Sequence, residues 1–384
     1  MVINFKKIYI FCLNCIQILL LVFLFLSSSD ARMKYSPLYI YIPIIYILIL
    51  FFLKFKKIKI NRENISIYIY WFLLLTHILI SVILGYSSLS KFQNYVCIFI
   101  FYFIIMANGN IELDYLAWAC ILLNLYLFYR CTSIGIYSPY YEGTAINSNQ
   151  FGIILCAGVP SSCYIIFQNV WFKRIIGIIT LVITFYLISL TSSRTSFFLV
   201  IVSLFLFLVY YFRNIINKEK LIKMRKFLIL FFLVFIILLI IFKNINWIYN
   251  FFFNKWNTSS DDIFSGRIEI WSNVILKTPF FGNEKNLLNV NNMFLQVWND
   301  IGFCGFFWYI LILFRILRIS LKKLTSNLNL SNIYIFNIVL LYLSIGMFET
   351  INTFLGKSIN VLFWIFAGYL VNNVRIKSDD EINT

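Results

Sequence analysis

Long apolar runs separated by short polar breaks follow one another along the whole chain. The clearest run occupies residues 226–242, where nearly every side chain after Lys226 is apolar. A helix needs about 20 such residues to cross the hydrocarbon core of a bilayer. The pattern therefore predicts about twelve spanning helices. Their expected cores are residues 8–26, 37–53, 66–86, 92–107, 113–131, 148–168, 174–190, 196–212, 226–242, 293–314, 332–348 and 358–373.

The fold class predicted from this pattern is all-α, a polytopic transmembrane helical bundle that forms a single integral membrane domain over residues 1–384. Helices satisfy their own backbone hydrogen bonds and therefore suit a bilayer, which contains no water. One long polar break, residues 243–292, separates spans nine and ten and is expected to be an external, periplasmic loop. Its apolar spacing between Ile268 and Ile275 favours a short amphipathic helix lying at the membrane surface.

The composition agrees with a membrane protein and excludes an ordinary soluble one. The chain is 61% hydrophobic and 12% charged, too few charges to coat its apolar surface in water. A net charge of +17 would suit nucleic acid, but the basic residues gather in alternate breaks between spans. Membrane lipids are therefore expected partners, and nucleic acid is not.

These alternating basic breaks predict the orientation, because Lys and Arg concentrate on the cytoplasmic side. The pattern puts both termini in the cytoplasm, with the chain crossing the membrane many times. The basic clusters are at residues 54–62, 173–174, 213–226, 315–323 and 375–377. The segments expected outside are 130–147, 191–195, 243–292 and 349–357.

The first apolar run has a second interpretation. Lys6 and Lys7 precede it and Ser29-Asp30-Ala31 follows, as in a cleaved signal peptide, which would leave the later orientation unchanged. Cys12 and Cys15 form a CxxC within it, without a second pair, so packing is favoured over metal or redox chemistry. The sequence also lacks a GxxxxGK[ST] motif, and no metal or other cofactor is expected.

Arg194 is the first candidate for chemistry at the external border. It lies in the turn TSSRTSFF between two apolar runs, next to Ser193. A guanidinium binds phosphate through two parallel hydrogen bonds and stays charged, and neighbouring hydroxyls can add further bonds. An interfacial arginine that anchors a helix end to lipid headgroups would explain the same pattern.

Arg267 is the second candidate, in the stretch SGRIEIW of the long loop. In a helix Arg267 and Trp271 share one face, and a cation beside an aromatic ring suits a phosphate joined to a sugar. An ordinary surface amphipathic helix is the alternative. Glu269, with Asp300 and Glu349, is an external carboxylate available as a base.

A third set of polar residues opens the span after the loop: Asn291, Asn292, Gln296, Asn299 and Asp300. Such groups are costly in a membrane unless they have partners or face water. Capping by an asparagine explains one amide but not the set. Asn149, at the start of another span, has an adequate explanation as part of a turn and helix cap.

The single histidine, His77, lies mid-span beside Thr76. An ionisable group within a membrane suggests a functional role by default. Its span contains no acidic partner, so a neutral, hydrogen-bonded packing role is favoured.

Taken in order, these segments resemble the O-antigen polymerase (Wzy-type) and O-antigen ligase superfamily of bacterial surface-polysaccharide enzymes. The matching features are an NxNxxG-like edge, TSSRTSFF, SGRxxIW with PFFGN downstream, and NxxLQxxxxxG from Asn292 to Gly302. The resemblance covers residues 145–310 by motif and the whole chain by span layout.

The resemblance implies a metal-independent glycosyltransferase that takes its glycan from an undecaprenyl-pyrophosphate-linked oligosaccharide at the periplasmic face. It implies pyrophosphate binding by Arg194 and Arg267 and a location in the bacterial cytoplasmic (inner) membrane. Glu269 and Asp300, as external carboxylates, are further catalytic candidates. A chain-length regulator and a flippase are the partner proteins it implies. Expected substrate contacts are Asn149, Ser193, Trp271, Asn291, Asn292 and Gln296.

A repeat-unit polymerase is the expected function, and two alternatives stay open. The ligase branch has a histidine directly before the asparagine of its third motif, where this chain has Asn291, which cannot take up a proton. A flippase or transporter would place polar residues mid-membrane in two related halves. Here the polar candidates concentrate at the outer border.

The predicted orientation can be tested with topology reporters. A reporter fused after Lys223 should read cytoplasmic, and one inserted near Asn257 should read periplasmic, because basic breaks stay inside. Paired alkaline phosphatase and green fluorescent protein fusions measure both sides. A periplasmic signal at Lys223 would reverse the orientation and with it every site assignment.

Overall fold

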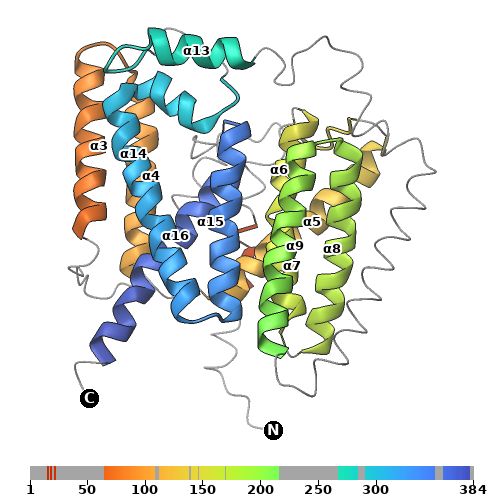
Figure 1. The fold of residues 1–384 in the computed structure, drawn as a ribbon. Coiled ribbons are helices and arrows are strands. Elements are labelled where there is room, and N and C mark those ends of the chain that lie inside the picture. Colours follow the sequence, from red (N-terminus) through yellow and green to blue (C-terminus); the bar gives the residue numbers. More distant parts are fainter. Residues whose placement is uncertain are drawn as a thin grey trace.

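The computed structural model describes residues 15, 16, 18, 19, 21, 22, 65–108, 112–137, 140–145, 147–168, 170–215, 267–283, 290–350 and 358–380. Within these residues the regular secondary structure is helical and includes no strand (Figure 1). The longer helices are α3 (Ile65–Ile83), α4 (Leu89–Asn108), α5 (Leu113–Ile134), α6 (Ser148–Cys156), α7 (Gly158–Ile166), α8 (Trp171–Thr191), α9 (Arg194–Ile215), α13 (Arg267–Lys277), α14 (Met293–Ser326), α15 (Leu330–Phe348) and α16 (Ser358–Asp380).

In the part of the chain that the structure describes, eight helical stretches are long and apolar enough to cross a membrane. One of them combines α6 and α7, and the apolar part of α16, Ile359–Val371, is shorter. The all-helical class is confirmed. Each predicted core from 66–86 to 196–212, and from 293–314 to 358–373, falls on an observed helix.

The other predicted spans, and part of the predicted external loop, lie outside the described residues. Cores 37–53 and 226–242 lie outside the described residues, as does most of 8–26, so the total of about twelve spans stays a prediction. Of the predicted external loop, residues 267–283 and 290–292 are described.

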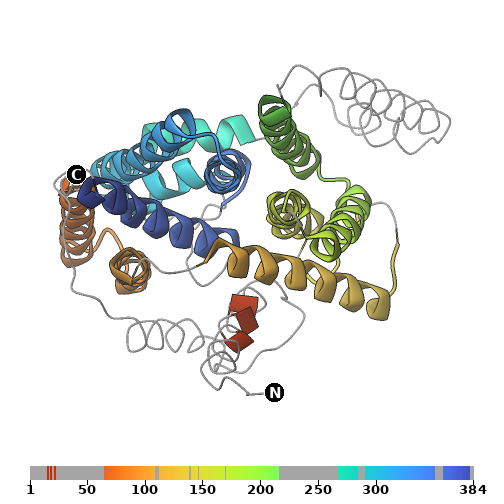
Figure 2. The same ribbon diagram turned by 90° about the horizontal axis from the view of Figure 1, so that it is seen from below.

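The helices form two groups joined by α15. Helices α3, α4, α14, α15 and α16 lie together, and α5 to α9 form the second group (Figures 1 and 2). Helix α15 packs against both α7 and α9. The amide of Asn337 in α15 donates to the carbonyl of Ser203 in α9 at 3.1 Å, which fixes the two helices against each other.

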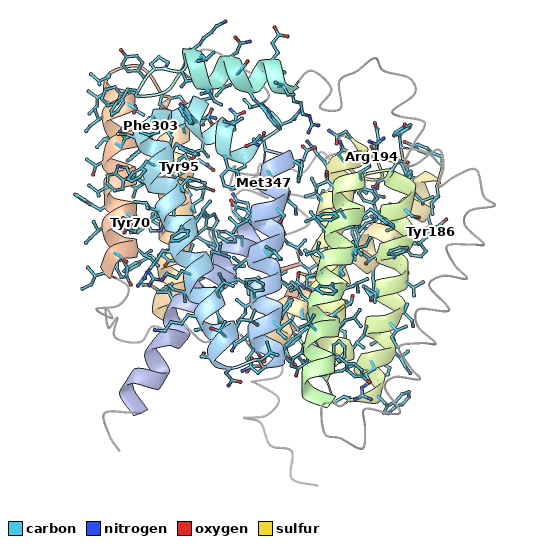
Figure 3. All side chains as sticks on the ribbon, in the orientation of Figure 1. Tyr70, Tyr95, Tyr186, Arg194, Phe303 and Met347 are labelled. Carbon is cyan, nitrogen blue, oxygen red and sulfur yellow. The ribbon has the colours of Figure 1, made fainter. Side chains whose placement is uncertain are left out.

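Helix α13 lies across one end of the bundle, which we call the α13 end (Figure 1). The turn that carries Arg194 and the end of α15 at Met347 lie towards the same end (Figure 3). Lys173 and Arg174 begin α8, so they lie at the opposite end from Thr191. Lys173 and Arg174 therefore lie at the other end of the bundle from Arg194 and Met347.

Large apolar side chains on the outside of the bundle indicate its solvent. Phe72, Ile83 and Phe205 are exposed by 69%, 75% and 61%. In water such a surface would drive aggregation, whereas lipid tails solvate it without cost. The exposed surface therefore fits a protein embedded in a bilayer.

A buried proline explains the interruption between α6 and α7. Pro160 lacks a backbone N–H and its ring crowds the carbonyl four residues earlier, which breaks the helical hydrogen-bond pattern at Ala157. Asn124 of α5 donates to the carbonyl of Leu155 at 3.1 Å and to Thr184 Oγ1 at 2.9 Å. A neighbouring helix thus hydrogen-bonds to the interrupted region.

Helix α14 differs from the predicted span 293–314 in two ways. It continues to Ser326, so Arg315 and Lys323 belong to the helix and not to a break. Arginine, lysine and leucine are good helix formers, and apolar length alone does not mark where a helix leaves the bilayer. It is also interrupted at Gly302, whose φ of 72° and ψ of 179° are open almost only to glycine.

The segment PFFGN packs into this interruption. The Asn283 N–H donates to the carbonyl of Asn299 at 2.7 Å. His77 Nε2–H donates to the carbonyl of Ile301 at 2.8 Å, and the His77 ring stacks on Phe281 with centroids 5.4 Å apart. His77 is hydrogen-bonded in the packed interior, as predicted, and it satisfies a carbonyl that the break in α14 would leave unpaired.

Substitution of Gly302 by alanine should destabilise the protein more than the same change at Gly85. Both glycines have positive φ, 72° and 75°, so both variants carry backbone strain of about 1 kcal/mol or more. A Cβ at Gly302 would also overlap the carbonyl of Phe280, whereas one at Gly85 meets nothing within 4 Å.

The measurement is the midpoint of thermal unfolding of the detergent-purified protein, followed by size-exclusion chromatography after heating. Equal losses for the two variants would mean that close packing at the break in α14 contributes nothing.

Candidate functional site

Helix α13 is the predicted surface helix, now observed as Arg267–Lys277. Val274 is its one buried residue. On the other side Ile268 and Leu276 are exposed by 56% and 81%. A helix with one packed residue and an exposed apolar face, lying across the ends of spanning helices, suits the boundary between lipid and water.

Arg267 and Trp271 connect α13 to the helices beneath it. Arg267 Nη1 donates to the carbonyl of Phe348, the last residue of α15, at 3.2 Å. Trp271 Nε1 donates to the carbonyl of Val290 at 3.0 Å. A cation at a helix C-terminus is favourable because the unpaired carbonyls there carry partial negative charge. Both side chains are partly buried, whereas Glu269 is exposed.

The two asparagines before α14 have local structural roles. Asn291 adopts a positive φ of 47°, a conformation that asparagine tolerates well. Asn292 caps α14 by accepting from the N–H of Leu295 at 3.0 Å, as the capping interpretation predicted. Its Nδ2 also donates to the carbonyl of Met347 at 2.9 Å, so Asn292 and Arg267 together bind the end of α15.

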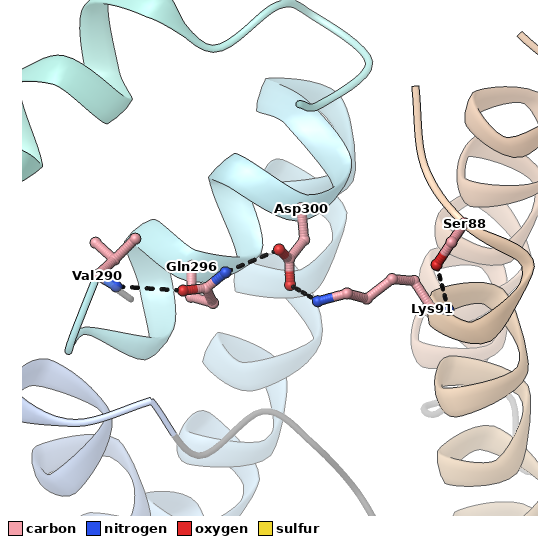
Figure 4. A network of polar contacts seen from close by, with 5 residues as sticks. All are labelled: Ser88, Lys91, Val290, Gln296 and Asp300. Atoms are coloured by element: carbon pink, nitrogen blue, oxygen red, sulfur yellow. Dashed lines mark hydrogen bonds and ion pairs between the residues drawn. The ribbon is translucent and has the colours of Figure 1, made fainter. Parts of the chain in front are cut away.

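Gln296 and Asp300 belong to a polar network that reaches α4 (Figure 4). Gln296 Nε2 donates to Asp300 Oδ1 at 2.8 Å, and Lys91 Nζ donates to Asp300 Oδ2 at 2.6 Å. The N–H of Val290 donates to Gln296 Oε1 at 3.4 Å. Asp300 is 2% exposed, so its charge is compensated in the interior by Lys91.

Lys91 is the residue that sequence reasoning missed. It lies in the first turn of α4, at the α13 end, where the predicted orientation disfavours cations. A lone lysine at the external edge of an apolar run was the available signal. Its partner lies more than 200 positions away, so sequence spacing could not connect them.

Arg194 begins α9 after a left-handed residue, Ser192, with φ of 53°. Ser193 is 1% exposed and its hydroxyl is within 2.9 Å of the Ser196 hydroxyl. The N–H of Ser193 donates to Thr191 Oγ1 at 3.2 Å. The hydroxyls around Arg194 therefore stabilise the turn, while the Arg194 side chain stays partly exposed.

Asn149 lies near Arg194 through the packing of α6 on α9. It is the second residue of α6, and Asn147 before it caps the helix by accepting from the Gln150 N–H at 2.8 Å. Gly152, one turn further, lies directly against Ser193 and Ser196, and a Cβ there would crowd both. The start of α6 and the start of α9 therefore meet.

The predicted site residues thus form two clusters. Arg267, Trp271, Asn292, Gln296 and Asp300 make up the first, around the ends of α13, α14 and α15. Arg194, Ser193 and Asn149 make up the second, at the starts of α6 and α9.

The contact between α9 and α15 shows how deep in the bundle each of the two clusters lies. Ser203 and Asn337 are bonded, Arg194 lies nine residues before Ser203, and Phe348 lies eleven residues after Asn337. At a rise of about 1.5 Å per residue these separations are about 14 and 17 Å, in the same direction along antiparallel helices. Arg194 and the carbonyl that binds Arg267 therefore lie at similar depth near the α13 end.

Among the described residues, no group of three histidine, cysteine or acidic side chains is placed to hold a metal ion. No protein-family model matches this chain, and no curated protein sequence does either.

Proposed function

We propose that this chain is a glycosyltransferase that joins undecaprenyl-pyrophosphate-linked oligosaccharide repeat units into O-antigen or capsular polysaccharide at the outer face of the bacterial cytoplasmic membrane. The observation that carries the proposal is the pair of arginines, Arg194 and Arg267, each at the start of a helix and at similar depth near one end of a bundle of membrane-length helices.

The reaction needs positive charge at that depth. The acceptor hydroxyl of one lipid-linked repeat attacks the anomeric carbon of a growing lipid-linked chain. A new glycosidic bond forms, the bond from that carbon to the pyrophosphate oxygen breaks, and undecaprenyl pyrophosphate leaves with the electron pair. Guanidinium groups stabilise the charge that develops on this leaving group and keep their own charge in a partly buried setting.

The hydroxyl proton passes to a carboxylate or to water. The contacts that each carboxylate makes in the structure show which of them are the better candidates for the base. Both oxygens of Asp300 are occupied, one by the Lys91 ammonium and the other by the Gln296 amide, which gives Asp300 a structural role and leaves neither oxygen open to a substrate hydroxyl. Glu269 is exposed on α13, and Glu349 directly follows the residue whose carbonyl binds Arg267. These two are the better candidates.

A gene deletion distinguishes polymerase from the alternatives. The deletion strain should carry surface lipid with a single repeat unit, because assembly and export continue while joining stops. Gel profiles of extracted lipopolysaccharide with silver staining measure it. Long polymer accumulating on undecaprenyl pyrophosphate would identify a ligase, and single units trapped on the cytoplasmic side would identify a flippase.

Arg194→Lys and Arg267→Lys should each abolish long polymer at a normal protein level. A planar, bidentate fork is not replaced by a compact ammonium, and loss of one transition-state donor lowers turnover by roughly 100-fold or more. A helix anchor would tolerate lysine. Polymer length on a silver-stained gel, beside an immunoblot of the membrane fraction, measures the effect.

Arg130→Lys is the matched control. Arg130 is a partly buried arginine near the end of α5, outside both clusters, and this variant should make polymer of normal length. Full-length polymer from both site variants would show that neither guanidinium is required.

A further inference from the structure

A continuous chain of polar contacts runs from α4 to α13 through the start of α14. It consists of Lys91, Asp300, Gln296, Val290 and Trp271, and we call it the relay (Figure 4 shows its first four members). Its four links are Lys91 to Asp300 at 2.6 Å, Gln296 to Asp300 at 2.8 Å, Val290 N–H to Gln296 at 3.4 Å and Trp271 to the Val290 carbonyl at 3.0 Å.

Each link in the relay has a fixed direction. An ionised carboxylate only accepts, so the Gln296 NH₂ group must face Asp300. The Gln296 carbonyl oxygen then faces the N–H of Val290, and the Val290 carbonyl accepts from the Trp271 indole. The charge state of Asp300 therefore determines which end of the Gln296 amide meets Val290.

Lys91 is the charged partner of Asp300. Asp300 is 2% exposed, and a buried carboxylate needs a cation and hydrogen-bond donors close by. Within the described residues, Lys91 is the one cation in a salt bridge with Asp300. Without the lysine, Asp300 Oδ2 loses its partner, and the carboxylate and the Gln296 amide bonded to it are no longer held in one orientation.

The relay matters because, within the described residues, α13 buries little apolar surface. Val274 is its single buried residue, and Ile268, Ile275 and Leu276 are exposed. The polar links from Trp271 to Val290 and from Arg267 to Phe348 therefore help to hold the helix in position. Arg267 and Trp271 are one helical turn apart. A contact that holds the Trp271 side chain therefore also holds the backbone from which the Arg267 side chain extends.

We propose that Lys91 is a positioning residue that, through the relay, fixes α13 and thereby the guanidinium of Arg267. The hydrogen bonds of the relay are observed in the structure, whereas the importance of the relay for polymerisation rests on the proposed function. Lys91 has no direct contact with the proposed reaction.

Hydrogen–deuterium exchange on the purified full-length protein in nanodiscs, resolved to single amides, tests the relay without substrate. In Lys91→Met the Val290 N–H and the amides of α13 should exchange at least about tenfold faster, because a hydrogen bond set by a charged group is lost. Lys91→Arg keeps the charge and should stay within about twofold of the parent. Helix α8 is the internal reference and should not change.

The charge exchange Lys91→Asp with Asp300→Lys separates a relay from a simple ion pair. An ammonium at position 300 only donates, so the Gln296 oxygen must turn to it and its NH₂ group then opposes the Val290 N–H. The exchanged pair should restore thermal stability and membrane level but leave Val290 exchange fast. If Lys91→Met alone does not fold, the charge-exchanged variant still tests the relay.

Polymer formation is the second readout, taken as the initial rate at saturating lipid-linked substrate. Lys91→Met and the charge-exchanged variant should each lose about tenfold or more in rate, and Lys91→Arg should retain it.

Slow Val290 exchange in Lys91→Met, or in the charge-exchanged variant, would overturn the relay whatever the activity. Fast Val290 exchange in Lys91→Met with an unchanged polymerisation rate would show that the relay does not position Arg267. Fast Val290 exchange in Lys91→Met, combined with a parent protein that exchanges slowly but makes no polymer, would refute the proposed function and leave the relay supported.

Discussion

Backbone hydrogen bonding is the constraint on which the rest of the structure depends. A bilayer offers no water to an unpaired N–H or C=O, so each break in a helix needs partners from elsewhere in the protein. At Gly302 the freed carbonyls of Asn299 and Ile301 accept from Asn283 and His77, which come from the loop and from α3. At Pro160 the neighbouring helix α5 contributes Asn124.

The same constraint brings the polar residues of the α13 end together. The last carbonyls of α15 bind Arg267 and Asn292, and the start of α14 is capped by Asn292. These bonds draw α13, α14 and α15 to one point. The side chains that best suit phosphate chemistry therefore share this end with side chains that complete the backbone, and one residue, Arg267, belongs to both sets.

Buried charged groups likewise need partners from elsewhere in the protein. Asp300 is carried into the interior by the short helical segment before Gly302, and it is tolerated there because Lys91 reaches it from α4. At the opposite end Asp114 accepts from Tyr164, Gln168 and Lys173, which ties α5 to α7 and α8. Each pairing adds a charged contact between neighbouring helices.

The order of residues alone was enough to predict the helical class, the described spans, the amphipathic helix now seen at 267–277 and the capping role of an asparagine before α14. These properties depend on local periodicity and on hydrogen bonds between neighbours in the chain, which the order of residues encodes directly.

Contacts between groups far apart in the chain could be known only from the way the helices pack. The break at Gly302 needed the backbone of residues 279–283 to fill it, and apolar length alone predicted an uninterrupted span there. The partnership of Lys91 with Asp300, and the grouping of Arg194 apart from Arg267, depend on how helices far apart in the chain pack. Periodicity carries no information about such pairs, because each helix satisfies the same pattern wherever its neighbours lie.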